Sequence, residues 1–268
     1  MNTTFGFIGT GNMGGALARA AAKTIEPQQL LLSDGYAPVA EKLASELHCQ
    51  AVSVDAVAEK AGFIFLGVKP QVMPTMLSGI APVLAKRKDT FVLISMAAGV
   101  AISDIRKMAG GDYPVIRIMP NIPVSVGSGV ILYDTTENVS AEATEVFCQA
   151  MRFAGLLDQL PEKLIDAGSA LSGCGPAFVS LFVEALADGA VACGLSRAQA
   201  LRYAAQTVSG TANMLIEKEM HPGQLKDAVC SPGGSTIAGV AALEQGAFRA
   251  DVMDAVVSAF HRTQELGK

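Results

Sequence analysis

Short apolar runs alternate with longer periodic stretches over the first 160 residues of the chain. The runs have the length of buried strands and cover residues 5–8, 29–33, 63–68, 90–95 and 115–119. Each run ends in a turn of small residues or proline, and helix-like patterns such as residues 16–22 lie between runs. This alternation is typical of a parallel sheet covered by crossover helices. We therefore predict a doubly wound α/β domain over residues 1–160.

Strand patterns stop near Pro161, and only helix patterns follow. They cover residues 162–171, 177–193, 198–219, 236–245 and 249–265. The stretch from Ala177 to Ala192 is apolar on nearly all sides, which indicates a helix buried in a core or an interface. We predict a second, all-helical domain over residues 161–268 and a homo-oligomer, at least a dimer, built through these helices.

Composition narrows the range of partners and compartments. The formal net charge is −5 and no basic run appears, so we expect neither nucleic acid nor an anionic membrane as a partner. The five cysteines form no CxxC pair and the three histidines are scattered, which favours free thiols and no metal site. The first strand begins within a few residues of the start, so we expect no export signal and a cytoplasmic protein.

A glycine-rich turn follows the first strand directly. The order is strand, then Gly9-Thr10-Gly11-Asn12-Met13-Gly14, then helix, which is the dinucleotide fingerprint of a Rossmann-type domain. The carboxyl ends of the other strands should line the same crevice. We expect the cofactor to contact Gly9, Thr10, Gly11, Asn12, Met13, Gly14, Ser33, Asp34, Val68, Lys69, Pro70, Ala97, Ala98, Gly99 and Asn121.

A second glycine-rich segment, Val229 to Gly239, lies near the end of the chain. Gly233 and Gly234 precede Ser235 and Thr236, and an apolar helix pattern starts at Ile237. Adjacent glycines let successive backbone N–H groups point into one space at a helix N-terminus. The segment therefore predicts a socket for a small anion such as a carboxylate.

Seven segments together resemble the pyrroline-5-carboxylate reductase family. They are GFIGTGNMG at 6–14, VKP at 68–70, MAAGV at 96–100, RIMPNIP at 117–123, LSGCGPAF at 171–178, HPGQLKD at 221–227 and VCSPGGSTIAG at 229–239. The resemblance extends along the whole chain in order. It implies NAD(P)H-dependent reduction of the cyclic imine 1-pyrroline-5-carboxylate to L-proline, with the helical domain contributing to substrate binding.

The resemblance also assigns roles to individual residues. It implies that Thr236 orients the imine nitrogen or the carboxylate while the proton comes from water, and that Lys69 contacts the cofactor. The alternative for Lys69 is an ordinary lysine at a strand end that is exposed to solvent. The alternative for Glu162 is a glutamate that only serves the start of a helix. The glycines of residues 172–176 either adjoin the active site or only allow close helix crossing. The implied substrate-binding residues are Glu162, Val229, Ser231, Gly233, Gly234, Ser235 and Thr236.

Cofactor choice and two rival functions stay open at this point. The resemblance favours NADPH, whereas Asp34 at the end of the second strand is typical of NADH binding. Ala228 replaces an asparagine that touches the cofactor in some relatives. A β-hydroxyacid dehydrogenase would need a lysine where Val179 stands. A nicotinamide-binding redox sensor without turnover would not need the anion socket.

Overall fold

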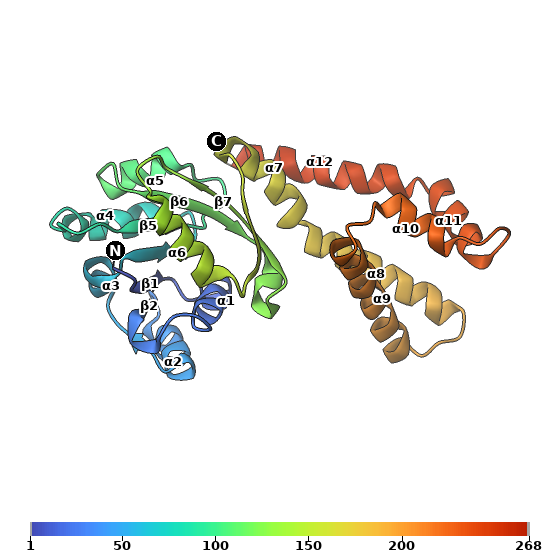
Figure 1. The fold of residues 1–268 in the computed structure, drawn as a ribbon, viewed down its shortest axis with the longest axis horizontal. Helices are drawn as coiled ribbons and strands as arrows, with labels where there is room; N and C mark the ends of the chain where they lie inside the picture. Colours follow the sequence, from blue (N-terminus) through green and yellow to red (C-terminus); the bar gives the residue numbers. More distant parts are fainter. Residues whose placement is uncertain (1, 267–268) are drawn as a thin grey trace. The chain divides into compact units, whose positions relative to one another are not determined.

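The computed structural model describes residues 2–266, which form two compact units. The first unit comprises the described residues up to Gly173 together with residues 260–266, and the second comprises Cys174–Ala259. The first unit contains all the described strands, and the second contains only helices and loops. An α/β domain with an all-helical partner, as the sequence predicts, is confirmed (Figure 1).

The first unit is built on one eight-stranded sheet with the order β3-β2-β1-β4-β5-β6-β7-β8. The strands are β1 (Phe5–Ile8), β2 (Leu30–Ser33), β3 (Gln50–Ala51), β4 (Phe63–Leu66), β5 (Val92–Ser95), β6 (Val115–Pro120), β7 (Gly129–Thr135) and β8 (Gly155–Gln159). All neighbours pair in parallel except β6 and β7, which pair antiparallel. The strand order reverses between the neighbours β1 and β4, because β2 and β3 extend to one side of β1 and β4 starts the other side. In such a sheet a crevice is expected at the carboxyl ends of the strands at this point.

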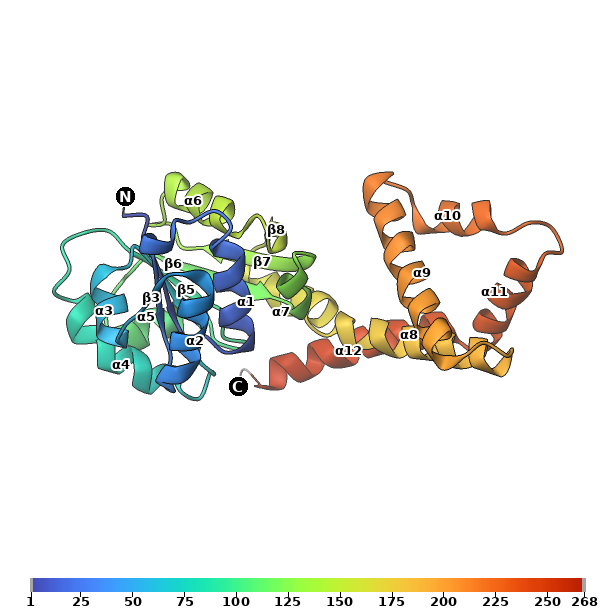
Figure 2. The same cartoon turned by 90° about the horizontal axis from the view of Figure 1, so that it is seen from below.

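Alternating side chains of the strands build two cores. Phe5, Phe7 and Phe65 pack with helices on one face of the sheet, whereas Ile8 and Leu66 pack with helices on the other. The first face carries α1 (Asn12–Ala21), α2 (Ala37–Leu47) and α6 (Ala141–Met151). The second face carries α3 (Val54–Lys60), α4 (Met73–Leu84) and α5 (Ile102–Ala109). Figure 2 shows these helices around the sheet. The unit also contains two short 3₁₀ segments, Pro27–Gln29 and Ile122–Val126 (η2).

The sequence boundary at 160/161 and the compact units divide the chain at different places. Strands end at Gln159 and helix α7 (Glu162–Ser172) follows, as the sequence predicts. However, Ile165 of α7 is fully buried against Met119 and Leu132 of the sheet, so α7 packs with the first unit. The predicted helix break is present, because α7 ends at Ser172 and the next helix starts at Gly175.

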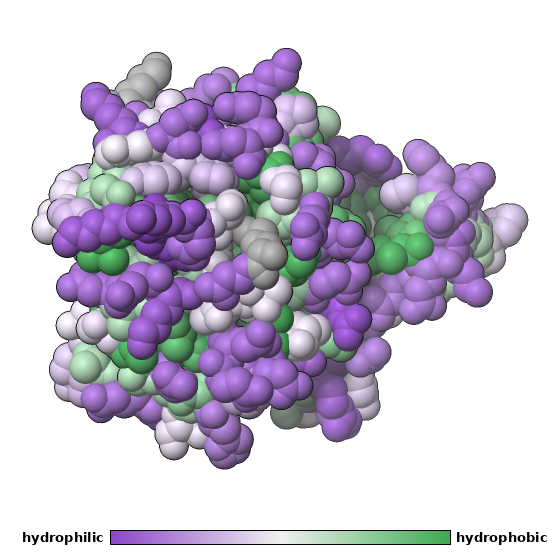
Figure 3. All heavy atoms as spheres, turned by 60° about the vertical axis from the view of Figure 1, so that its left-hand side comes forward, coloured by the Kyte–Doolittle hydropathy of each residue, from purple (hydrophilic) through white to green (hydrophobic). Residues whose placement is uncertain are grey.

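The second unit consists of α8 (Gly175–Ala192), α9 (Arg197–Glu217), α10 (Pro222–Val229), α11 (Ser235–Gln245) and most of α12 (Phe248–Leu266). Helices α8 and α9 pack along each other through Ala187, Ala200 and Ala204. Many large apolar side chains of this unit are exposed, including Leu181 at 68%. The visible face of the first unit in Figure 3 is mainly hydrophilic by contrast. The helical stretch Glu162–Ala192 is long and apolar enough to cross a membrane, judged by length and composition alone.

Candidate active site

The turn after β1 has geometric reasons for its glycines. Gly9 has a φ of +95°, in the left-handed region, and a side chain there would strike the backbone of Gly67 after β4. A Cβ on Gly14 would collide with the carbonyl oxygen of Gly9, so α1 approaches the turn too closely for any side chain. Helix α1 therefore starts directly behind the turn, with first-turn N–H groups that no side chain caps. This cradle fits a pyrophosphate.

Asp34 ties the end of β2 to this turn. Its Oδ2 accepts hydrogen bonds from the backbone N–H of Thr10 at 2.7 Å and from the Thr10 hydroxyl at 3.2 Å. Its Oδ1 accepts one from the backbone N–H of Tyr36 at 3.0 Å. Asp34 and the buried Ser33 line a cavity of about 490 Å³ at the carboxyl ends of β1, β2 and β4. Hydrogen bonds thus join the glycine turn to the end of β2, where Ser33 and Asp34 line the cavity.

The remaining predicted cofactor residues follow β4, β5 and β6. Val68 lines the cavity that Asp34 lines, and Lys69 is exposed just beyond it. Ala97 is buried in the turn that leads from β5 toward α5, and Gly99 in that turn has a φ of +71°. These positions lie at the same edge of the sheet because β1, β4 and β5 are parallel neighbours.

Asn121 has a structural role that the sequence analysis did not find. Its Nδ2 donates to the carbonyl of Ser172 at 2.9 Å, and its Oδ1 accepts from the backbone N–H of Val130 at 2.8 Å. The side chain is buried and joins the end of β6 to the last residue of α7. Its amide oxygen and nitrogen are therefore both engaged within the protein.

Glu162 contacts the start of α5 and a buried arginine. Its Oε1 accepts a hydrogen bond from the backbone N–H of Ile102 at 2.8 Å and lies 3.2 Å from Arg117 Nη1. Arg117 also reaches Asp166 Oδ1 at 3.1 Å, and its Nε is buried without a hydrogen-bond partner. The backbone N–H of Glu162 in turn donates to Asp134 Oδ2 at 2.6 Å. These contacts give Glu162 a role in the fold, and sequence spacing did not reveal Arg117 as its partner.

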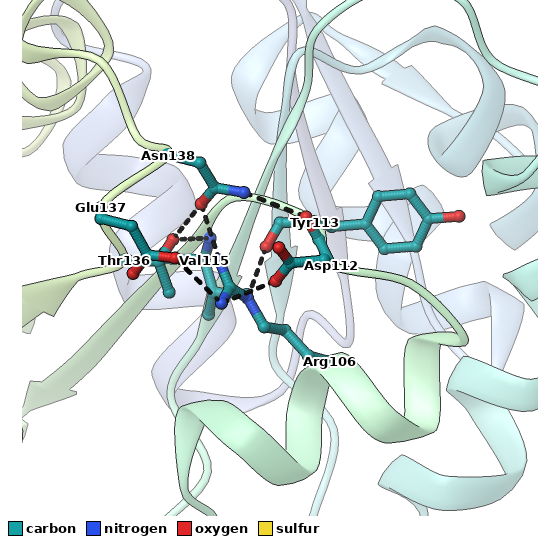
Figure 4. Close-up of polar contacts among 7 residues, drawn as sticks. All are labelled: Arg106, Asp112, Tyr113, Val115, Thr136, Glu137 and Asn138. Carbon is teal, nitrogen blue, oxygen red and sulfur yellow. Dashed lines mark hydrogen bonds and ion pairs between the residues drawn. The ribbon is translucent and has the colours of Figure 1, made fainter.

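A second polar network surrounds Arg106 and contains none of the predicted site residues. Arg106 donates to the carbonyl oxygen of Tyr113 at 3.0 Å and to Asn138 Oδ1 at 2.7 Å, and it pairs with Asp112 at 2.7 Å (Figure 4). The Thr136 hydroxyl donates to the same Asn138 oxygen at 2.6 Å. The network fastens the end of α5 to the turn after β7, so its role is in the fold.

The loop between α10 and α11 is the segment for which the sequence predicts an anion socket, and it lies in the second unit. Gly233 has a φ of +67°, and the N–H of Gly234 bonds the carbonyl of Ser231 at 3.0 Å. Gly234 is the N-cap of α11 and offers no side chain to cap it. Ser235 and Thr236 are exposed in the first turn of the helix. Their backbone N–H groups and the helix dipole therefore face solvent at an exposed N-terminus.

Two family models match this chain. The model described as pyrroline-5-carboxylate reductase dimerisation matches residues 162–266, and the model described as NADP oxidoreductase coenzyme F420-dependent matches residues 4–99. The two matches fall on different parts of the chain: the first on the helices from α7 onward, the second on the glycine turn and the strands around it.

Similar proteins of known identity cover nearly the whole length. The pyrroline-5-carboxylate reductase of Glycine max is 40% identical over 98% of this chain and 96% of its own. A structure of a pyrroline-5-carboxylate reductase from Coxiella burnetii superimposes with a TM-score of 0.93 at 30% identity, covering 100% of both chains. The Plasmodium falciparum pyrroline carboxylate reductase with NADP bound has a TM-score of 0.86 at 31% identity, covering 99% of this chain and 98% of its own.

Proposed function

This chain belongs to the pyrroline-5-carboxylate reductase family, and on that premise we propose how its residues reduce 1-pyrroline-5-carboxylate to L-proline with NADPH or NADH. The reaction is the last step of proline synthesis, and the chain is an oxidoreductase that acts on a C=N bond. The observation that carries this conclusion is about 40% identity to reductases of plants, archaea and bacteria over the full length. Both the turnover-free sensor and the β-hydroxyacid dehydrogenase lack such support.

The first unit holds the dinucleotide in this proposal. The glycine turn accepts the pyrophosphate, because the first N–H groups of α1 lie directly behind it and have no side-chain cap. Asp34 and Ser33 lie at the adenosine end, in the cavity at the carboxyl ends of β1, β2 and β4. Lys69 and the turn at Ala97 to Gly99 lie at the neighbouring strand ends, where the nicotinamide belongs. When bound, the cofactor supplies a hydride.

The second unit holds the substrate carboxylate. The exposed N–H groups of Ser235 and Thr236 and the positive end of α11 attract one small anion. Gly233 supplies the left-handed turn that aims them outward. Val229 and Ser231 frame the same loop and are exposed. The contacts of the Glu162 Oε1 with Ile102 and Arg117 support the alternative interpretation of Glu162, a glutamate that serves the start of a helix.

Thr236 is the residue we assign to the imine nitrogen. Its hydroxyl stands in the first turn of α11, beside the N–H groups that hold the carboxylate. A threonine hydroxyl is too weak an acid to protonate an imine at neutral pH, so it orients the nitrogen while water supplies the proton. Most of the rate enhancement then comes from holding the imine carbon in a fixed orientation.

The helical unit also joins copies of the chain, at least as a dimer. An apolar groove of about 560 Å³ runs between α8 and the α11–α12 region, lined by Phe178, Phe182, Leu243 and Phe248 among others. The match to a dimerisation family covers the whole helical region. A second copy explains the exposed apolar side chains of Glu162–Ala192 without a membrane. We place the protein in the cytoplasm, with no nucleic-acid partner. No group of metal-ligating side chains occurs among the described residues.

The decisive experiment measures oxidation of NADPH and NADH by the purified protein, with and without 1-pyrroline-5-carboxylate. We expect oxidation that depends on the imine and yields proline. Thr236→Ala should lower kcat by about 10²-fold or more while leaving dinucleotide binding unchanged, the size typical of losing one positioned group. Folded wild-type protein that turns over neither cofactor would refute the assignment.

A further inference from the structure

The adenosine end of the dinucleotide crevice is closed by a carboxylate that two loops hold in place. Asp34 accepts from the backbone and hydroxyl of Thr10 through Oδ2 and from the backbone of Tyr36 through Oδ1. Three hydrogen bonds from separate donors leave this side chain little freedom to swing away from an incoming ligand. They also occupy three of the roughly four acceptor positions of a carboxylate, so one position is left for a hydroxyl donor.

The charge around this cavity has one sign. Asp34 and Glu41 both line it, with Ser33 and Ser53 as the hydroxyl residues beside them. Over the described part of the chain, the residues that line the cavity include no lysine and no arginine. A phosphate monoester there would carry close to two negative charges and would meet no cation among those residues.

We propose that Asp34 selects against a 2′-phosphate and makes NADH the better cofactor of this enzyme. The inference rests on the proposed function for its physiological meaning, but not for the binding it predicts. A ribose 2′-hydroxyl donates to the free acceptor position of Asp34. A 2′-phosphate brings like charge against a fixed carboxylate and finds no compensating arginine fork.

Two basic side chains of α1 and α2 line a different hollow. Arg19 and Lys42 border a space of about 410 Å³ between α1 and α2, together with Tyr36 and Glu46. Arg19 is committed to Glu46, with Nε and Nη2 donating to the two carboxylate oxygens at 2.7 and 2.8 Å. Lys42 is thus the one alternative partner for a phosphate that this hollow offers among the described residues. A variant of Lys42 therefore tests whether the phosphate binds in this hollow instead.

The test compares AMP with adenosine 2′,5′-bisphosphate by isothermal titration calorimetry, in the absence of imine. Wild-type protein should bind the bisphosphate at least about tenfold more weakly than AMP, the size of one like-charge contact near a protein surface. The difference should shrink in high salt, because exposed charges are screened. During imine reduction, kcat/KM for NADH should exceed kcat/KM for NADPH, in agreement with the binding preference.

Four variants assign the effect. Asp34→Asn keeps an acceptor for Thr10 but removes the charge, so the affinities for AMP and the bisphosphate should come to within about threefold of each other. Asp34→Ser also removes the charge and should have the same effect. Glu59→Gln, an exposed change of equal charge on α3, should leave the ratio unchanged. AMP affinity in each variant shows that the crevice is intact. The proposal fails if wild type binds the bisphosphate as tightly as AMP, if it binds neither, or if Lys42→Met selectively weakens the bisphosphate.

A lack of turnover has a separate meaning. Protein that binds AMP over the bisphosphate but does not reduce the imine would refute the proposed function and leave the selectivity of Asp34 standing. Protein that reduces the imine faster with NADPH than with NADH would support the proposed function and refute the selectivity of Asp34.

Discussion

The carboxylate of Glu162, the first residue of α7, accepts the backbone N–H of Ile102, the first residue of α5, at 2.8 Å. The same oxygen, Oε1, pairs with Arg117, whose side chain is only 6% exposed. One carboxylate oxygen therefore caps a helix that follows the β5 turn and neutralises a buried cation of β6. The turn at Ala97 to Gly99 is fixed at its far end by this contact.

Replacing Glu162 tests that relationship. Glu162→Ala should lower the free energy of unfolding by about 1–3 kcal/mol, because it leaves Arg117 with Asp166 as its remaining partner and uncaps α5. Glu162→Gln still accepts from Ile102 and should lose less. Urea unfolding followed by circular dichroism provides the measurement. Equal stability of Glu162→Ala and wild type would show that the contact contributes nothing.

The stacked phenylalanines at the centre of the sheet should dominate its stability. Phe7 and Phe65 stack with ring centroids 4.3 Å apart, and neither is exposed. Phe65→Ala should cost about 3–5 kcal/mol through lost burial and a residual cavity. Phe65→Leu should cost clearly less, since it refills part of the volume. If the two variants unfold at the same denaturant concentration, cavity formation is not the cause.

The socket loop depends on Gly233 for its shape. Gly233→Ala should raise KM for the imine and leave dinucleotide affinity unchanged, because a φ of +67° is strained for alanine. Gly239→Ala is the matched control within α11, where an added Cβ meets nothing within 4 Å and should favour the helix by about 1 kcal/mol. A normal KM in Gly233→Ala would argue against the loop as the carboxylate site.

Tyr133 should make stability fall at high pH. Burial, and then the hydrogen bond with Cys148, raise the pKa of Tyr133 from its ordinary value to about 12. The unfolded chain therefore loses this proton first. The contribution to stability is complete below about pH 10 and is lost as pH rises toward 12, at up to about 1.4 kcal/mol per pH unit.

The measurement is the free energy of unfolding against pH, with tyrosinate absorbance as a second signal. Tyr133→Phe should flatten the part of the curve that is due to this group. An unchanged curve in Tyr133→Phe would mean that Tyr133 titrates normally.

The sequence predicted those elements whose burial is uniform. β1, β4 and β5 are buried along their full length and appear in the sequence as apolar runs. The helices from α7 onward were predicted apart from α10, and α8 was predicted as a stretch that is apolar on nearly all sides. β3, β7 and β8 were not predicted: β3 is two exposed residues, β7 is only partly buried and β8 is largely exposed. Pairing with neighbouring strands, which a local pattern does not contain, makes them strands.

The candidate site shows the same division. The turn at Gly9 and the loop at Gly233 could be predicted as turns, because their backbone conformation favours glycine. The partners of Asn121 and Glu162 could not, since Ser172 lies 51 residues from Asn121 and Arg117 lies 45 residues from Glu162. Such contacts depend on which side of the sheet α7 occupies. That is decided by the burial of Ile165 and not by the residues near either partner.

The first unit is not contiguous in the chain, because residues 260–266 of α12 belong with it while residues 174–259 form the second. A ribosome therefore releases the sheet and the whole helical unit before it releases the last piece of the first unit. Domains usually fold as they emerge during synthesis, but the sheet unit lacks residues 260–266 until these have been made. Helix α12 thus links completion of the sheet unit to completion of the rest of the chain.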